Sequence, residues 1–408
     1  ARDCAFLDAI GHQGNDFQMT KGFWAEINRL SVAYEAPSRF VAVPGYEWSG
    51  NTTVGGDHNV YYYDQGRPIR RSSHAMLSDL SDLDSDCATA SELFAALLGE
   101  DAVVNAHVGG RYADVRAHHD GRVKRSVEIH SAWGTFEWIL MDSFAAGHRV
   151  GVVANSDGHK GRPGASHPGA SMFGAFGGLT CFLTDQLSRD RIMDCWRARR
   201  HYATTGARIH LDVRAGFHAP ARLFADDPAL GPVAEMEAEE AVMGDIVAPG
   251  EGMTTLRAEA AGTAPLLTID LFDGPDLMDT FRPFGEKDLG ARIRVVWEGA
   301  RYRGRGRAVT WDGAAILAGN AFADFSAVNF FNAYRPLAQT APGTLAWRSM
   351  TTGNFAGFQA RLKNGLKGRL RMETPPVTEE VAIKDLGLDD KVFPGEGLAV
   401  ALRLRRLP

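Results

Sequence analysis

The stretch GVVANSDGH at residues 151–159 combines the two features that organise the first half of this sequence. Its apolar run, Val152 to Ala154, is typical of a strand that is covered on both faces. The run leads directly into Asp157 and His159, whose side chains can bind a metal ion. The stretch therefore predicts a buried strand that ends at a polar site.

Four other apolar runs of the same kind lie between residue 1 and about residue 210. Helix-like segments such as 89–98 and 188–200 alternate with them, and Ser188 is a suitable residue to cap the second. Continuous apolar strands with helices between them indicate a parallel sheet or barrel that is covered on both faces. The four runs are AFL at 5–7, FVAV at 40–43, AVV at 102–104 and VEI at 127–129.

Side chains that can bind a metal ion follow these runs. In parallel α/β barrels the carboxyl ends of the strands converge on one face, where active sites are built from several strands. Imidazole and carboxylate groups without thiolate favour Mn, Fe or Zn over calcium and over a cysteine-rich structural zinc site. We therefore expect a site for divalent Mn, Fe or Zn ions. Its candidate ligands are His12, Glu47, His58, His107, Asp157 and His159.

Each candidate also has an ordinary structural interpretation. Asp157 can cap a helix beside an incidental histidine, His107 can be a satisfied core histidine, and the GGDHN sequence around His58 can be a simple turn. The distribution of histidine favours a functional use in the first half of the chain. All 13 histidines lie between His12 and His218, and none follows.

Two residues are candidates for contacts with a substrate. Because side chains alternate along a strand, Glu128 and His130 should point the same way, so both can reach the site. Arg162 lies in a Gly-rich loop just after Asp157, where a guanidinium can hold a phosphate or carboxylate; an ordinary surface arginine is the alternative. There is no GxSxG motif and no convincing Cys–His pair, so a serine or cysteine nucleophile is not expected.

The second half of the chain follows a different pattern. Residues 219–253 are rich in Ala, Pro and acidic residues, and we interpret 211–253 as a linker or edge segment. Alternation with period two appears beyond it, as in GLAVALRLRR at 397–406, which places Leu398, Val400, Leu402 and Leu404 on one face. We expect a metal-binding domain over 1–210 and a β-rich, sandwich-like domain over 254–408.

Composition limits the partners and the location. A net charge of −6 gives no basic footprint, so nucleic acid is not expected as a partner. No apolar run approaches the roughly 20 residues that span a bilayer. Four widely spaced cysteines without a CxxC pair indicate reduced thiols, which favours the cytoplasm. Because the chain begins at Ala1 rather than Met, a periplasmic or secreted location stays open.

Three of the motifs resemble the successive metal motifs of the PHP (polymerase and histidinol phosphatase) superfamily: GYEWS at 45–49, NAHVG at 105–109 and NSDGH at 155–159. LDAIGH at 7–12 lies where that family has a strand ending in Asp-His, and DHNVY at 57–61 would add another histidine ligand. IHSAWGTFEW at 129–138 and RRHYATTG at 199–206 look like a bacterial branch with a β-rich C-terminal region. The resemblance covers about residues 1–210.

The resemblance implies an α/β fold, a distorted (β/α)7 barrel with a site for up to three divalent metal ions. It also implies hydrolysis of a small phosphorylated substrate, by attack of metal-bound hydroxide on phosphorus, with His130 or Arg162 meeting the substrate's charge. Two alternatives remain. The same fold and metals can act on another ester, an amide or a sugar-linked bond, or the barrel can be a non-catalytic module that binds a ligand.

Two departures from the family pattern concern the start of the chain. The opening His-x-His motif is absent, and Gly11 stands before His12 where the family has Asp. We expect the first strand to lie upstream of Ala1, so that the N-terminal part of the barrel is lacking in this chain. Otherwise the site lacks two ligands.

Overall fold

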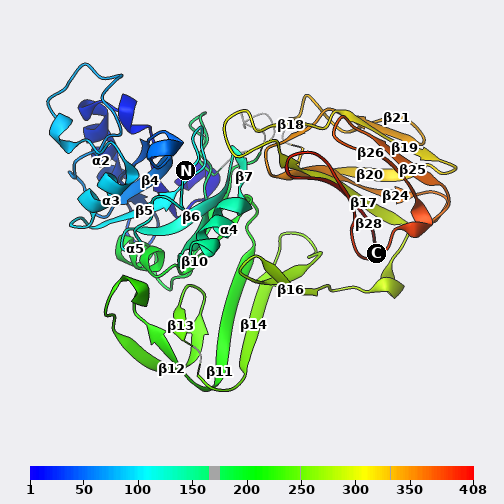
Figure 1. Ribbon diagram of the computed structural model, residues 1–408. Coiled ribbons are helices and arrows are strands. Elements are labelled where there is room, and N and C mark those ends of the chain that lie inside the picture. The colour runs from blue at the N-terminus through cyan, green and yellow to red at the C-terminus, as the bar shows by residue number, and fades with distance from the viewer. Residues whose placement is uncertain (165–174, 249, 331) are drawn as a thin grey trace.

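The computed structural model describes residues 1–164, 175–248, 250–330 and 332–408, and the chain forms three successive parts (Figure 1). The N-terminal part ends near residue 206 and contains every α-helix of the described ranges. A group of long, exposed strands follows. The C-terminal part is a two-layered stack of strands. The helices are α1 (Arg2–Ala5), α2 (Lys21–Tyr34), α3 (Ala90–Leu97), α4 (Glu137–Ala145) and α5 (Arg189–Arg197).

A mixed sheet forms the centre of the N-terminal part. Its strands β5, β6 and β8 are parallel, whereas β4 is antiparallel to both of its neighbours, β3 and β5. Two short pairs lie beside it, β1 with β2 and β9 with β10. The bounds are β1 (Ala9–Gly11), β2 (Val41–Val43), β3 (Gly45–Ser49), β4 (Asp57–Tyr62), β5 (Ala102–Ala106), β6 (Lys124–Ser131), β7 (Gly134–Thr135), β8 (Gly151–Ala154), β9 (Leu179–Phe182) and β10 (His201–Thr204).

The expectation of a (β/α)7 barrel is wrong. Strands make up 40% of the structure and helices only 16%, and within the described ranges no sheet closes on itself. The connection between β3 and β4 gives a physical reason. Residues 50–56 form a tight turn in which Gly55 and Gly56 have φ angles of 131° and 78°. So short a link cannot contain the crossover that parallel strands require, so β4 runs antiparallel to β3.

The pleat of the central sheet sorts its side chains between two environments. Trp48 and Val60 belong to an apolar core that they share with α2 and α3. Glu47 and Asn59, their neighbours in sequence, point to the opposite face and line a cavity. On that second face Tyr61 also packs against α5, in the apolar cluster of which it is a member. The acidic side chains of the sheet that line the cavity therefore lie on one face.

Side-chain caps fix the starts of three helices. The hydroxyls of Thr20, Thr89 and Ser188 accept hydrogen bonds from backbone N–H groups in the first turns of α2, α3 and α5. Ser188 is the cap that the sequence predicts. No helix in the described ranges has both the length and the apolar character that crossing a membrane requires.

Residues 211–253, interpreted from composition as a linker or edge segment, consist mainly of strands. They form an antiparallel sheet in which β11 pairs with three other strands, and a separate hairpin follows. Ion pairs attach the sheet to the N-terminal part, for example Arg149 to Asp227 at 2.9 Å and Arg200 to Asp245 at 3.1 Å. The bounds are β11 (His210–Phe224), β12 (Glu235–Val242), β13 (Ile246–Ala248), β14 (Thr254–Ala261), β15 (Ile269–Asp273) and β16 (Asp276–Phe281).

Two five-stranded antiparallel sheets form the C-terminal sandwich. Their facing side chains make one apolar core, in which the rings of Trp297 and Trp347 stack at 4.5 Å. Val400, Leu402 and Leu404 of the alternating segment belong to this core. One sheet contains β17 (Arg292–Ala300), β20 (Phe322–Val328), β24 (Phe355–Leu362), β27 (Lys391–Pro394) and β28 (Leu398–Leu407). The other contains β19 (Gly313–Ala318), β21 (Ala338–Ala341), β22 (Thr344–Trp347), β25 (Arg369–Glu373) and β26 (Thr378–Ala382), and β18 (Val309–Thr310) pairs with β23 (Met350–Thr351) beside them.

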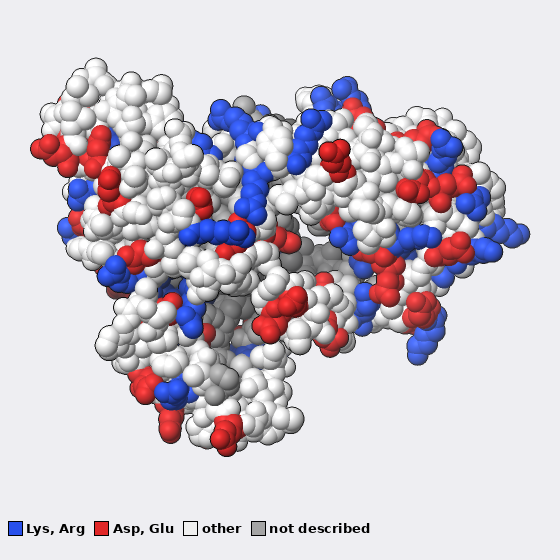
Figure 2. Space-filling view, viewed as in Figure 1, with Lys and Arg blue, Asp and Glu red and all other residues white. Residues whose placement is uncertain are grey.

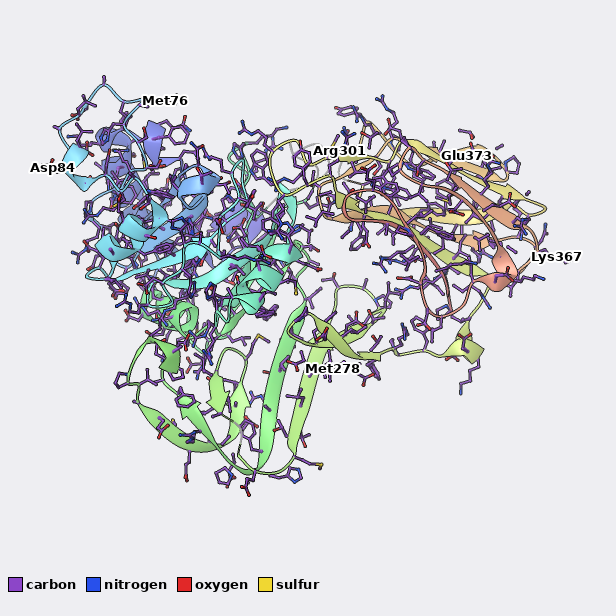
Figure 3. The ribbon with its side chains drawn as sticks, viewed as in Figure 1. Met76, Asp84, Met278, Arg301, Lys367 and Glu373 are labelled. Carbon is purple, nitrogen blue, oxygen red and sulfur yellow. The ribbon has the colours of Figure 1, made fainter. Side chains whose placement is uncertain are left out.

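Among the described residues, the loop 301–307 and Thr352 of the sandwich contact the N-terminal part. The loop 301–307 joins β17 to β18, and Figure 3 labels Arg301 at its start. The backbone N–H of Thr135 donates to the carbonyl of Thr352 at 3.3 Å. Lys and Arg side chains gather over this junction in the space-filling view (Figure 2).

Candidate functional site

A cavity of about 1010 Å³ opens on the polar side of the central sheet. Its walls come from β1, from the odd-numbered positions of β3 and β4, and from the loop that follows β8. Five carboxylates and four imidazoles line it within the described residues, together with amide, hydroxyl and apolar groups. The residues with acidic or imidazole side chains that face one another there are Glu47, His107, Glu128 and Asp157.

His107 is the centre of the group. It follows β5 directly, is 2% exposed, and its Nδ1 lies 2.8 Å from Oε1 of Glu128. Its Nε2 faces Oδ2 of Asp157 at 3.3 Å. Burial alone disfavours the charged imidazole, but Glu128 and Asp157 outweigh burial and raise the pKa of His107 well above its ordinary value. Asn155 donates to the second oxygen of Glu128 and so fixes that carboxylate.

Glu47 and Asp57 bring two more carboxylates to the group. Glu47 lies in the middle of β3 and accepts a hydrogen bond from Ser49 at 2.8 Å, and Asp57 begins β4 opposite Ser49. Burial, and then the charge of Asp57, raises the pKa of Glu47 to about 8. Arg111 balances part of this charge, since its Nε donates to Asp57 at 2.8 Å and its Nη2 lies 3.8 Å from Glu47. Two acidic side chains thus lie close together here, with Arg111 as their shared cationic partner.

Gly109 leaves open the space between His107 and Asp57. A methyl group at this position would lie 2.9 Å from Nε2 of His107 and 3.0 Å from Oδ2 of Asp57. Both atoms therefore border the same small volume, and only a residue without a side chain keeps that volume free. Gly110, the next residue, is different, because its nearest neighbour would be the tip of Arg305 at 2.8 Å.

The group has the chemistry of a site for Mn, Fe or Zn, which bind imidazole nitrogen and carboxylate oxygen. Oδ2 of Asp157 is buried and accepts no hydrogen bond from any described residue, which leaves an acceptor for a cation. As the side chains stand, no three His, Cys, Asp or Glu side chains of the described ranges are arranged to hold one ion. Arg111 holds Asp57 and Ser49 holds Glu47, so these two carboxylates need to turn before they can join His107 and Asp157.

Asp157 has a backbone conformation that few residues adopt. Its φ angle is 40°, in the left-handed region, where Asp and Asn are enriched among residues other than glycine. The turn aims the carboxylate back at His107 immediately after β8 ends. Strained backbone of this kind often lies at functional sites.

Two of the sequence candidates lie at the rim of the cavity. His12 is exposed, accepts a hydrogen bond at Nδ1 from the N–H of Gly14 at 3.2 Å, and lies edge-on to Phe23. The side chain of His159 is 48% exposed, and its Nδ1 lies 3.2 Å from the carbonyl of Asp157. Both line the cavity, but neither belongs to the buried group around His107.

His58 lies on the other face of the sheet. Its ring is fully buried and packs edge-on against Phe94 at 5.2 Å, and Nδ1 pairs with the carbonyl of Gly56 at 3.0 Å. Burial and the charge of Lys124 lower its pKa well below the ordinary value. The structure therefore gives His58 the environment of a neutral core histidine.

His130 and Arg162 also lie apart from the group. A register shift between Glu128 and His130 interrupts the pairing of β6 with β8, so the two side chains do not share the simple alternation that the sequence suggests. Both ring nitrogens of His130 have protein partners at 2.8 Å, the hydroxyl of Thr135 and the carbonyl of Phe176, and burial lowers its pKa to about 4. Arg162 is exposed and is not among the described residues that line the cavity.

The structure adds residues that the sequence reasoning missed. Asp57 and Arg111 belong to the buried group, and Tyr61 turns its ring toward the cavity. Burial and the nearby charges of Glu128, Asp157 and Glu47 raise the pKa of Tyr61 above its ordinary value, so its hydroxyl remains a donor.

A signal for Asp57 and Tyr61 was present in the sequence. Side chains at alternate positions of a strand point to the same face. In β4, Asp57, Asn59 and Tyr61 therefore share one face, and His58 points to the other.

Comparison of the chain with protein-family models, with curated proteins and with solved structures found no match.

Proposed function

We propose that this protein is a metal-dependent hydrolase that acts on a phosphoester of a small molecule. The buried group of four carboxylates around His107, with a buried Asp157 oxygen that faces the imidazole at 3.3 Å without a hydrogen bond and a cavity in front of it, carries the proposal. Burial of so many acidic groups is costly unless a cation accompanies them. The resemblance of the motifs at 45–49, 105–109 and 155–159 to PHP metal motifs supports the same activity.

His107 and Asp157 would hold the metal, with Glu47 and Asp57 as further ligands. A bound Mn, Fe or Zn ion would supply a Lewis acid for the phosphoryl group. Glu128 accepts the Nδ1 proton of His107, which keeps Nε2 unprotonated and directed at the cavity when a cation takes that position. Asn155 in turn fixes Glu128.

The other residues of the site handle the substrate. Tyr61 remains protonated and can donate a hydrogen bond into the cavity. Arg111 is held between Asp57 and Glu47, and when a metal neutralises these carboxylates its guanidinium becomes available to an anionic group. Because all four cysteines are free thiols, the cytoplasm is the location that we propose.

Hydrolysis of a panel of esters tests this function. The protein is incubated with Mn²⁺ and assayed on p-nitrophenyl phosphate, bis-p-nitrophenyl phosphate and p-nitrophenyl acetate. We expect cleavage of a phosphoester and a loss of at least about a hundredfold in Asp157→Asn, since removal of a ligand charge weakens both metal and transition-state binding. Asn is the suitable replacement because it tolerates the φ angle of 40°.

Asp101→Asn is the matched control. Asp101 pairs with Arg197 on the surface, with 45% of its side chain exposed, and lies outside the cavity lining. Cleavage of the acetate alone would replace the phosphoesterase by a metal-dependent hydrolase of other esters. Absence of all cleavage would leave a non-catalytic module that binds a ligand.

A further inference from the structure

The loop RYRGRGR at 301–307 carries four arginines from the C-terminal sandwich to the edge of the candidate site. Figure 3 places Arg301 where this loop leaves β17, and Figure 2 shows basic side chains over the same junction. Arg301 and Arg305 are exposed, whereas Arg307 is buried. The loop is therefore not only a surface segment, because the side chain of Arg307 is buried.

Arg303 accounts for the attachment of the loop. Its guanidinium donates to both oxygens of Asp142, at 2.6 and 3.2 Å, and lies over the ring of Trp138 at 4.4 Å. Charge and stacking are both satisfied by these contacts. Arg303 thus attaches the loop to α4.

Arg307 lies next to the carboxylate group. It is 3% exposed, its Nη2 donates to the carbonyl of Gly109 at 2.6 Å, and its guanidinium lies 4.9 Å from the ring centre of Phe136. Gly109 is the residue whose added methyl would touch both His107 and Asp57. One residue therefore separates the guanidinium from the atoms at the centre of the site.

One side of the Arg307 guanidinium lacks a partner. Its Nη1 is buried and has no hydrogen-bond acceptor among the described residues. Burial lowers the pKa of Arg307 to about 10, while Asp57 and Asp157 act in the opposite direction, so the group stays charged at neutral pH. A buried charged donor without an acceptor is costly, and an anionic ligand would satisfy it.

We propose that Arg307 binds the phosphoryl group of the substrate, so that the C-terminal sandwich completes the site of the N-terminal part. The proposal rests on the phosphoesterase function above. Arg307 interacts electrostatically with Asp57 and Asp157, and its Nη1 still lacks an acceptor among the described residues, so a positive group lies beside the carboxylates. A phosphate ester and a divalent cation together match these charges.

Binding of inorganic phosphate tests the proposal. Calorimetric titration with phosphate, without metal and with saturating Mn²⁺, is made for the full chain, Arg307→Gln, Arg307→Lys and Arg303→Gln, and Mn²⁺ affinity is measured for each separately. We expect phosphate to bind about ten- to a hundredfold more weakly to Arg307→Gln, the range for loss of a charge-assisted hydrogen bond, with Mn²⁺ affinity unchanged within about twofold. Arg307→Lys should fall between the two, because it keeps the charge but not the planar fork.

Arg303→Gln is the matched control, because it weakens the same junction without touching the site. It should bind phosphate as the unchanged protein does. Equal weakening in Arg303→Gln and Arg307→Gln, or a parallel loss of Mn²⁺ affinity in Arg307→Gln, would overturn the proposal in favour of a purely structural role. Unchanged phosphate binding in Arg307→Gln would also overturn it and would leave the metal site standing. If the protein takes up no Mn²⁺ but phosphate binding still depends on Arg307, the proposed hydrolase fails and the anion site remains.

Discussion

Substitution of Gly109 by Ala should close the metal site while leaving the fold intact. The added methyl would lie 2.9 Å from Nε2 of His107, closer than Cβ atoms are found to approach, and 3.0 Å from Oδ2 of Asp57, a tight contact. The imidazole cannot move freely away from this methyl, because Glu128 holds its Nδ1. Overpacking of this kind costs about 1–3 kcal/mol. If this cost applies to the metal-bound state alone, the affinity for the metal ion falls by about five- to 150-fold.

Calorimetric titration with Mn²⁺ measures this loss directly, with the urea midpoint of each variant as a measure of folding. Gly110→Ala is the matched control, since its methyl would meet only the flexible end of Arg305. We expect Gly110→Ala to bind Mn²⁺ like the unchanged protein and Gly109→Ala to bind at least about fivefold more weakly. Equal affinity in the two alanine variants would refute the argument that the ion occupies the space beside Gly109.

Three further predictions concern buried polar residues. Lys124 is fully buried, and burial lowers its pKa to about 7 from 10.5. Between these pH values the folded state binds fewer protons than the unfolded state, so the free energy of unfolding should rise by about 1.4 kcal/mol per pH unit. Urea unfolding at pH 7 and pH 9 should show this rise, and Lys124→Met should abolish it. Glu128→Gln should weaken Mn²⁺ binding by about ten- to a hundredfold, because the glutamine no longer accepts the imidazole proton with a full charge; a titration that shows unchanged affinity would remove Glu128 from the site. His58→Phe should leave Mn²⁺ stoichiometry unchanged in a metal assay, since His58 lies on the opposite face of the sheet, and loss of an ion would contradict that placement.

The strands and some of the site residues could be predicted because their signals are local. The apolar runs at 41–43, 102–104 and 152–154 lie in β2, β5 and β8, and the residues that follow β5 and β8 include His107 and Asp157. A run of apolar residues that ends in a polar side chain needs no knowledge of distant parts of the chain. The contact of 3.3 Å between these two side chains then follows from the way that β5, β6 and β8 pair.

Pairing direction and fine register could not be predicted in the same way. The expected barrel required parallel neighbours throughout, whereas the short turn at Gly55 and Gly56 reverses the chain and makes β4 antiparallel. Similarly, the register shift between Glu128 and His130 changes which side chains share a face, and no feature of the sequence VEIH at 127–130 predicts this shift. In both cases the deciding interaction is between strands rather than within one.

The remaining site residues could not be predicted because they lie far along the chain from their partners. Arg111 reaches Asp57 across 54 residues, and Arg307 reaches the carbonyl of Gly109 across 198. Their loops have no apolar periodicity that would orient a side chain. The arginine-rich composition of 301–307 indicates positive charge, but only the folded arrangement shows which of its arginines is buried beside the carboxylates.

Metal content tests the central claim most directly. The protein is purified without chelator and analysed by elemental mass spectrometry beside Asp157→Asn and the surface control Asp101→Asn. Our account predicts at least one equivalent of Mn, Fe or Zn in the unchanged protein and in Asp101→Asn, and a loss of that metal in Asp157→Asn. Retention of the metal in Asp157→Asn, or absence of metal from all three proteins even after incubation with Mn²⁺, would contradict the assignment of the group around His107 as a metal site.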